Sequence, residues 1–134
     1  MLTRMDHVGI VAHTMDEASD VLIEKLGFAL DVARSPLPEG LRFEAENTQI
    51  FFVKIGLGET RVEILLPEDA TKSIGRYLEK RGPGMHHLCY ASDDVVGDAA
   101  RLRNEGLQMI DLGADPAALG GCFFHPRSMG GILT

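Results

Sequence analysis

Two stretches of the chain carry the same order of apolar and polar positions. Residues 7–12 form a short apolar run that is typical of a buried strand. Thr14 and Glu17 then make a capping-box pattern ahead of apolar residues at helical spacing, and Gly27 ends that helix. Further strands are predicted over residues 28–33, 49–55 and 60–66, with a loop over residues 35–40.

The second half of the chain repeats this order. Residues 87–91 predict a strand, and Asp94 is placed to cap a helix that ends at Gly106. The last strands are expected over residues 107–110, 122–124 and 131–134, with a glycine-containing loop over residues 112–121. Repeats this short must pair to bury their apolar faces, so we expect the two halves to pack together.

The pattern therefore predicts an α+β fold in which two βαβββ modules form a curled mixed sheet with an open cleft. We place the first module at about residues 4–67, a connecting helix at about 71–81 and the second module at about 84–134. The length of 134 residues is that of a single domain with a real core.

Histidines at matching positions are the first candidates for chemistry. His7 and His87 each open the first strand of a repeat. A lone histidine on an apolar strand is usually a packed core residue, but a symmetric pair favours metal ligation, since imidazole binds zinc, cobalt, nickel, manganese or iron. Glu63 shares a strand face with Arg61 and Leu65. Spacing alone leaves Glu63 open between a solvated strand residue and a third ligand.

The other three histidines are weaker candidates. His13 ends a strand beside a predicted cap, so a surface role is expected. His86 points to the opposite strand face from His87, so only one of the two can face the cleft. His125 precedes Pro126 and is left open between a pocket residue and an ordinary loop residue.

Composition narrows the class of protein. The net charge of −7 and a pI near 5.1 argue against nucleic acid as a partner. No apolar run approaches the roughly 20 residues that span a bilayer, and residues 1–7 lack the apolar core of a signal peptide, so we expect a soluble cytoplasmic protein without a membrane partner. Cys89 and Cys122 lie in apolar stretches and are expected to be buried free thiols rather than a disulfide.

Several longer motifs point to a known family. They are DHVGI at 6–10, TRVEILLP at 60–67, SIGRYLEKRG at 73–82, GMHHLC at 84–89 and HPRSMGGILT at 125–134. These segments resemble the methylmalonyl-CoA epimerase family, a branch of the vicinal oxygen chelate superfamily that also contains glyoxalase I. The resemblance covers nearly the whole chain and keeps the motif order.

The resemblance implies one divalent metal ion in the cleft, held by His7, Glu63 and His87. Co²⁺ is the expected metal, with Zn²⁺, Ni²⁺ and Mn²⁺ as alternatives. The fourth ligand of the family is a glutamate that would directly follow Thr134, so we expect the natural chain to continue and the last strand to be truncated here.

The implied activity is that of an isomerase. A family member of this type epimerises (2R)/(2S)-methylmalonyl-CoA, an acyl-CoA, by removing the C2 proton and returning it through a metal-stabilised enolate. Glu63 is the catalytic candidate within the chain, because the expected catalytic glutamate lies beyond Thr134. For the second base, Glu44, Glu46 or neither remains open. Arg127 is either a contact for a substrate anion or a solvated loop residue, and family habit leads us to expect a homodimer.

Other functions share this arrangement of residues. A glyoxalase I-type lactoylglutathione lyase would use the same metal cage on a different substrate. A ligand-sequestering member of the superfamily would bind without catalysis, and retention of all three metal ligands argues against it. An iron dioxygenase would use two histidines and one carboxylate as its facial triad.

Overall fold

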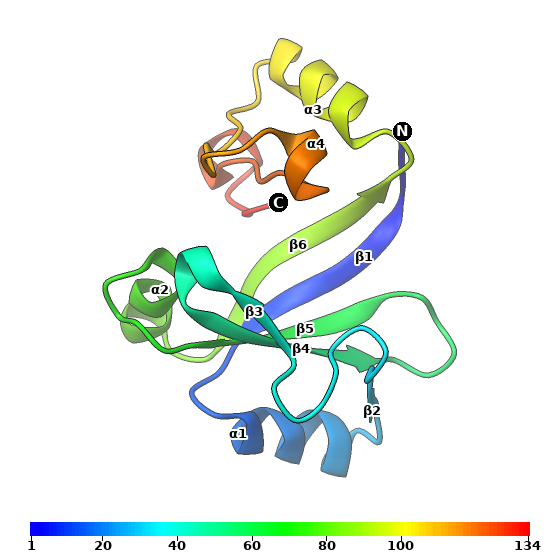
Figure 1. Ribbon diagram of the computed structural model, residues 1–134, viewed down its shortest axis with the longest axis vertical. Coiled ribbons are helices and arrows are strands. Elements are labelled where there is room, and N and C mark those ends of the chain that lie inside the picture. The colour runs from blue at the N-terminus through cyan, green and yellow to red at the C-terminus, as the bar shows by residue number, and fades with distance from the viewer. The chain divides into compact units, whose positions relative to one another are not determined.

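The computed structural model describes all residues, 1–134, and shows an α+β fold with a mixed sheet of six strands (Figure 1). The strands run in the order β2-β4-β5-β1-β6, and β3 pairs with β4. β1 and β5 are parallel, whereas β4 pairs with β5, β2 and β3 in antiparallel fashion. The strands are β1 (Leu2–Val11), β2 (Ala29–Leu30), β3 (Leu41–Phe43), β4 (Thr48–Lys54), β5 (Arg61–Pro67) and β6 (Gly84–Ser92).

The helices are short. They are α1 (Met15–Ser19), the π-helix η1 (Asp20–Lys25), the 3₁₀ turn η2 (Glu44–Glu46), α2 (Ser73–Arg81), α3 (Val95–Asn104), α4 (Pro116–Leu119) and the 3₁₀ turn η3 (Pro126–Ser128). Of these, α1, η1, η2 and α2 lie between strands in sequence, and α3, α4 and η3 follow β6. The chain forms two compact units, residues 7–86 and residues 1–6 with 87–134. The boundary passes through β1 after Asp6 and through β6 after His86. No helix in the structure is long and apolar enough to cross a membrane.

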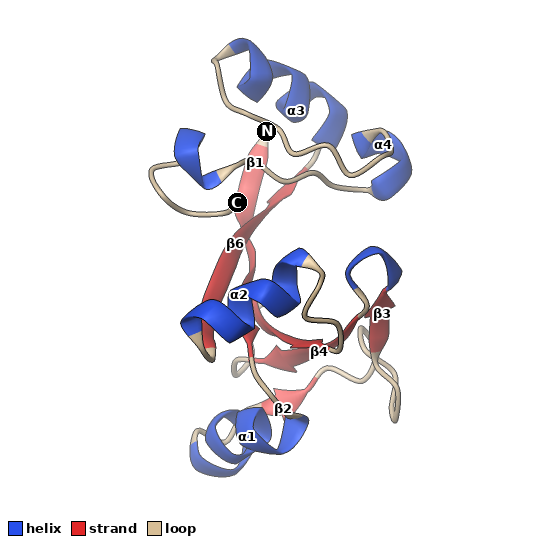
Figure 2. Ribbon diagram, turned by 90° about the vertical axis from the view of Figure 1, so that its left-hand side faces the viewer, coloured by secondary structure: helices blue, strands red, loops and turns tan.

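In the unit formed by residues 7–86, helices cover both faces of the sheet (Figure 2). On one face, Ala18 of α1 and Leu22 of η1 pack against alternate residues of β4 and β5. These strand residues are Phe51, Val53, Ile64 and Leu66. On the other face α2 buries Ile74 and Leu78 against Val11 and Leu65. The alternation of strand side chains thus directs odd positions of β5 toward the face that α2 covers.

The start of α2 is fixed from outside the helix. Lys72 occupies the N-cap position without a side-chain cap. Instead, the Glu46 carboxylate accepts hydrogen bonds from the Ser73 hydroxyl at 2.7 Å and from the Ile74 N–H at 3.1 Å. A carboxylate satisfies the open N–H groups of a helix start and suits its partial positive charge. Glu46 therefore ties η2 to α2.

In the other unit, α3 begins where the sequence predicts it. The Asp94 side chain accepts from the Gly97 N–H at 2.9 Å, and α4 packs against α3. Asp98 in α3 accepts from the Ser92 hydroxyl, which holds the pKa of that carboxyl below its usual value with help from Arg101. These polar contacts anchor α3 to the end of β6.

The prediction of a complete second βαβββ module is wrong in its last three strands. The segments 107–110, 122–124 and 131–134 form no regular strand and meet through a single isolated bridge, Met109 to Phe124. Backbone hydrogen bonds also join Phe124 to Thr134 and Leu88 to Leu133. The turn η3 and two consecutive glycines with positive φ, Gly130 and Gly131, interrupt the chain before a ladder can extend.

Two smaller expectations also fail in this structure. The strand predicted over 28–33 is reduced to Ala29–Leu30, because Asp31 starts a turn in which its carbonyl accepts from Arg34 and Ser35. The loop predicted over 112–121 contains the short helix α4, whose first turn is capped by Asp115.

Candidate metal centre

His7 and Glu63 are brought together by the parallel pairing of β1 with β5. In that register His7 lies opposite Arg61, and Gly9 lies opposite Glu63. Both side chains are buried, with 8% of His7 and 7% of Glu63 exposed. The His7 Nε2 atom lies 3.4 Å from the Glu63 Oε2 atom. Glu63 is therefore not the solvated strand residue that spacing alone allowed.

Phe52 packs directly beside this pair. It lies opposite Glu63 in the β4–β5 register, and its ring meets the His7 ring edge-on with centroids 5.4 Å apart. The Arg34 guanidinium stands over the Phe52 ring at 3.9 Å, a cation–π geometry. Because Phe52 is itself buried, these contacts hold the His7 ring in one orientation.

An ion pair supports the start of β5, opposite His7. The Arg61 Nε atom donates to the Asp31 Oδ2 atom at 2.7 Å. The Arg61 guanidinium holds the pKa of the Asp31 carboxyl below its ordinary value of 3.8, and the Arg34 N–H adds to the effect. Asp31 is only 5% exposed, so this ion pair is a buried one. It links the turn after β2 to the strand that carries Glu63.

The two neighbouring histidines of β6 make contacts with different partners, as their alternation predicts. The His86 ring meets Tyr77 of α2 at 4.6 Å, whereas His87 meets Phe123 at 5.5 Å. His87 is 4% exposed. A histidine this deep and this closely packed has a fixed ring, which suits a ligand.

These three side chains fit a divalent metal ion by their chemistry. His7, Glu63 and His87 are all buried and each offers one ligand atom, and these atoms lie within 4.8 Å of one another. Two imidazole nitrogens and one carboxylate oxygen suit zinc, cobalt, nickel, manganese and iron. A buried carboxylate such as that of Glu63 costs free energy unless it is paired or bound to a cation. The group is consistent with a divalent metal site, and its donor set does not identify the metal.

The other residues singled out from the sequence have different surroundings. Glu44 is exposed over 83% of its side chain, and its carboxylate lies 3.8 Å from Arg42. Arg127 is exposed in η3, and its backbone N–H donates to the His125 Nδ1 atom at 3.1 Å. His125 is thus a capping residue of a short turn. His13 is exposed, as expected.

Sequence reasoning missed two groups of residues near this centre. The Asp31–Arg61 pair joins positions 30 residues apart, and charged residues in a sequence are first assigned to the surface. Asp6 and Cys89 lie beside His7 and offer a further set of ligand atoms. A signal for Cys89 was available, because a residue two positions after His87 on a strand shares its face.

Comparisons with known proteins show which family the chain belongs to. Residues 6–124 match the family model described as the glyoxalase/bleomycin resistance protein/dioxygenase superfamily. An ethylmalonyl-CoA/methylmalonyl-CoA epimerase from Cereibacter sphaeroides is 28% identical, with 100% of this chain and 96% of the relative covered. The crystal structure of methylmalonyl-CoA epimerase from Mycobacterium tuberculosis is similar with a TM-score of 0.80 at 25% identity, over 98% of this chain and 85% of that one.

A third relative was solved with an acyl-CoA ligand. It is a Streptomyces coelicolor methylmalonyl-CoA epimerase in complex with 2-nitronate-propionyl-CoA, with a TM-score of 0.81 at 26% identity over 100% of this chain and 95% of that one. The family match covers most of the chain, and the relatives span its full length. The chain belongs to the glyoxalase/bleomycin resistance protein/dioxygenase superfamily.

Proposed function

We propose that this protein is a divalent-metal-dependent epimerase that interconverts the (2R) and (2S) forms of methylmalonyl-CoA. The observation that carries the proposal is the buried group of His7, Glu63 and His87, which offers two imidazoles and one carboxylate at short range. Relatives whose names describe methylmalonyl-CoA epimerases support the choice of substrate. Co²⁺ is the metal we propose.

In this proposal His7, Glu63 and His87 hold the ion. A bound divalent ion supplies Lewis acidity, which stabilises negative charge as it develops on the thioester oxygen. Phe52 contacts the His7 ring and Phe123 contacts the His87 ring, and these contacts restrict the orientation of both imidazoles. Little reorganisation of the two side chains is then needed when the ion binds.

Epimerisation also needs a base that removes the C2 proton and an acid that returns one on the other face. We propose Glu46 rather than Glu44 for one of these roles. The Glu46 carboxylate is oriented by two hydrogen bonds from α2, whereas the Glu44 side chain is exposed. Variants of the Streptomyces coelicolor epimerase replace a glutamate and a glutamine seventeen positions later, the interval that separates Glu46 from Glu63.

The substrate is an anion, and the chain offers guanidinium groups to meet it. Arg127 is one candidate because its side chain is exposed in η3. Arg34 is another, because its guanidinium lies over the Phe52 ring, and the same ring contacts His7. Guanidinium suits both a carboxylate and the phosphates of CoA. We further propose that the protein works as a homodimer in the cytoplasm.

The test is exchange of the C2 proton of methylmalonyl-CoA with solvent deuterium, followed by mass spectrometry. Cobalt-loaded protein should catalyse exchange, and metal-free protein should not. Glu63→Met keeps the volume of the buried side chain but removes the ligand, so exchange should fall by at least ~100-fold. Glu63→Gln keeps an oxygen ligand and should retain much more of the exchange. Glu24→Met makes the same change at an exposed helical position and should leave exchange unaltered.

Two results would overturn the proposal. One is a failure of the cobalt-loaded protein to exchange the C2 proton at all. The other is exchange that is equal in Glu63→Met and the wild type. Turnover of a methylglyoxal–glutathione hemithioacetal in place of methylmalonyl-CoA would instead identify the lactoylglutathione lyase activity. Glu46→Gln tests the base, because it keeps the size of the side chain and one of its two acceptor oxygens but not its basicity, and exchange should fall by about 10²-fold or more.

A further inference from the structure

We propose that Arg34 recognises the free carboxylate of a malonyl-type acyl-CoA and so selects such substrates over uncharged acyl-CoA thioesters. Residues 31–35 form the turn that follows β2, and Arg34 lies in this turn with its side chain half-buried. The Arg34 guanidinium lies over the Phe52 ring, with its central carbon 3.9 Å from the ring centroid. Both residues belong to the unit formed by residues 7–86.

The turn is fastened to Phe52 at both of its ends. The Asp31 N–H donates to the Phe52 carbonyl at 2.8 Å, and the Phe52 N–H donates to the Ser35 hydroxyl at 2.9 Å. That hydroxyl donates in turn to the Asp31 carbonyl at 2.9 Å. Asp31, Ser35 and Phe52 are all at most 5% exposed. Because buried hydrogen bonds are costly to break, the backbone on either side of Arg34 is fixed relative to the ring that its guanidinium covers.

The Asp31 carboxylate holds the backbone of Arg34 and has a cationic partner of its own. Its Oδ1 atom accepts from the Arg34 N–H at 3.2 Å, and its Oδ2 atom accepts from Arg61 Nε at 2.7 Å. Both oxygens of this carboxylate therefore have donors other than the Arg34 guanidinium. A guanidinium has five N–H donors, so a further partner of Arg34 leaves donors that can bind an anion.

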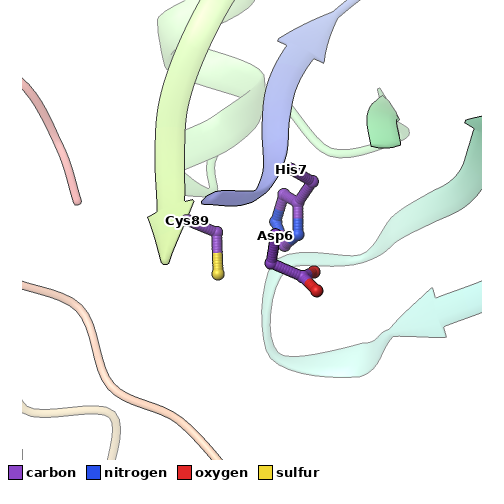
Figure 3. A group of neighbouring side chains, drawn as sticks. All are labelled: Asp6, His7 and Cys89. Atoms are coloured by element: carbon purple, nitrogen blue, oxygen red, sulfur yellow. The ribbon is translucent and has the colours of Figure 1, made fainter. Parts of the chain in front are cut away.

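The Arg34 guanidinium lies on the face of the sheet that carries Glu63. Phe52 is directly opposite Glu63 in the antiparallel register of β4 and β5, and directly opposite residues place their side chains on the same face. The His7 side chain projects from β1 (Figure 3), and its ring meets the Phe52 ring edge-on with centroids 5.4 Å apart. One buried ring thus contacts both the Arg34 guanidinium and a proposed metal ligand.

This position suits one anion of the substrate better than the others. The free carboxylate of methylmalonyl-CoA is attached to C2, next to the thioester carbon, so it lies close to any group that acts on the thioester. The CoA phosphates lie at the far end of the pantetheine arm. A guanidinium beside the proposed metal ligands is therefore matched to the carboxylate. It would also offset the repulsion between that carboxylate and the negative charge that develops on the thioester oxygen.

The test is isothermal titration calorimetry of the cobalt-loaded protein with malonyl-CoA and acetyl-CoA, which differ only by the carboxylate. The wild type should bind malonyl-CoA more tightly. Arg34→Met keeps a long side chain that can contact the Phe52 ring, but it removes the charge. The affinity for malonyl-CoA should then fall by about 10- to 100-fold, whereas the affinity for acetyl-CoA should not change. Arg34→Lys keeps the charge but not the planar fork of donors, so its loss should be intermediate.

Arg42→Met is the matched control, because it makes the same replacement at an exposed arginine of the same unit. Its affinities for both thioesters should equal those of the wild type. Thermal unfolding by circular dichroism checks the fold of each variant. An unchanged affinity of Arg34→Met for acetyl-CoA would show independently that this variant is folded.

Three results would contradict the inference. A wild type that fails to bind malonyl-CoA more tightly than acetyl-CoA would show that the carboxylate is not recognised. Unchanged affinity of Arg34→Met for malonyl-CoA would show that Arg34 takes no part in recognition. An equal loss of affinity for both thioesters would instead assign the guanidinium to the CoA moiety that they share.

The identity of the substrate rests on the proposed function, and the two proposals can fail separately. A selective loss of malonyl-CoA binding in Arg34→Met, with no C2 proton exchange by the cobalt-loaded wild type, would leave this inference standing and reject the proposed function. Exchange by the wild type, together with undiminished malonyl-CoA binding by Arg34→Met, would do the reverse.

Discussion

The buried ion pair of Asp31 and Arg61 gives a sharp test of how the centre is supported. Its two partners lie on the turn after β2 and at the start of β5, two residues before Glu63. Arg61→Met keeps the length and apolar stem of the side chain but removes the donor to the Asp31 carboxylate. The Asp31 carboxylate then stays buried, and it keeps the hydrogen bond from the Arg34 N–H.

The expected loss of stability follows from burial and geometry. Removing one partner of a buried charged hydrogen bond costs about 3–5 kcal/mol when both groups are fully enclosed. Arg61 keeps part of its surface in water and the Arg34 N–H remains, so we expect about 2–3 kcal/mol here. For a chain of this size that corresponds to a fall in melting temperature of roughly 6–10 °C.

Arg42→Met is the matched control. Arg42 makes a comparable ion pair with Glu68, its Nη2 atom lying 2.7 Å from Oε2, but both of these side chains are exposed. Exposed pairs contribute about 0–1 kcal/mol, so this variant should melt close to the wild type. Thermal unfolding of the three proteins by circular dichroism makes the comparison. Equal melting temperatures for the two variants would refute the assignment of a buried, stabilising pair.

The pH dependence of the Arg61→Met effect has a defined sign. The folded protein holds the pKa of Asp31 below its ordinary value of 3.8, chiefly because Arg61 donates to it. The resulting stability is present above the unfolded pKa and disappears as pH falls through the lower folded pKa. The difference in melting temperature between the wild type and Arg61→Met should therefore be full at neutral pH and shrink below about pH 3.8. A difference that grows on acidification would contradict this sign.

Three further changes should have measurable effects. Addition of Co²⁺ at about 100 times its dissociation constant should stabilise the wild type by about 2.7 kcal/mol in a thermal-shift assay and leave Glu63→Met unmoved, whereas equal shifts would exclude Glu63 as a ligand. Phe52→Leu removes the ring that orients His7, so calorimetry should show metal affinity reduced by about 10-fold; unchanged affinity would show that the ring contact has no part in binding. Gly75→Ala should destabilise by about 1–3 kcal/mol despite the better helix propensity of alanine, because its Cβ would collide with the Asp69 carbonyl; a gain in melting temperature would disprove that close approach.

Much of the first half of the fold follows from local patterns in the sequence. The alternation in β5 predicts that residues 61, 63 and 65 share a face, and the structure packs Leu65 toward α2 and Ile64 toward the first helix. Thr14 and Asp94 accept hydrogen bonds at the helix starts that their positions predict. Caps and strand faces depend on residues a few positions apart, which is why a sequence reveals them.

The parts that sequence reasoning could not supply depend on contacts between distant segments. β3 is three residues long and forms because Asn47, with a positive φ, turns the chain back so that Leu41 pairs with Ile50. The expected last three strands contain enough apolar residues, but they meet only through the isolated bridge of Met109 with Phe124, and η3 and the positive φ of Gly130 and Gly131 precede the last of them. The burial of Glu63 likewise follows from its neighbours in three dimensions and not from its place in the strand.

The most direct test of the central claim is the position of the metal itself. Crystals of the cobalt-loaded protein, measured at the cobalt absorption edge, should give one anomalous difference peak bonded to His7 Nε2, Glu63 and His87 at about 2.0–2.2 Å. A peak of that kind would establish the three residues as ligands of one ion. A cobalt peak that lies away from Glu63 and His87, or no ordered peak at all in loaded crystals, would contradict the account.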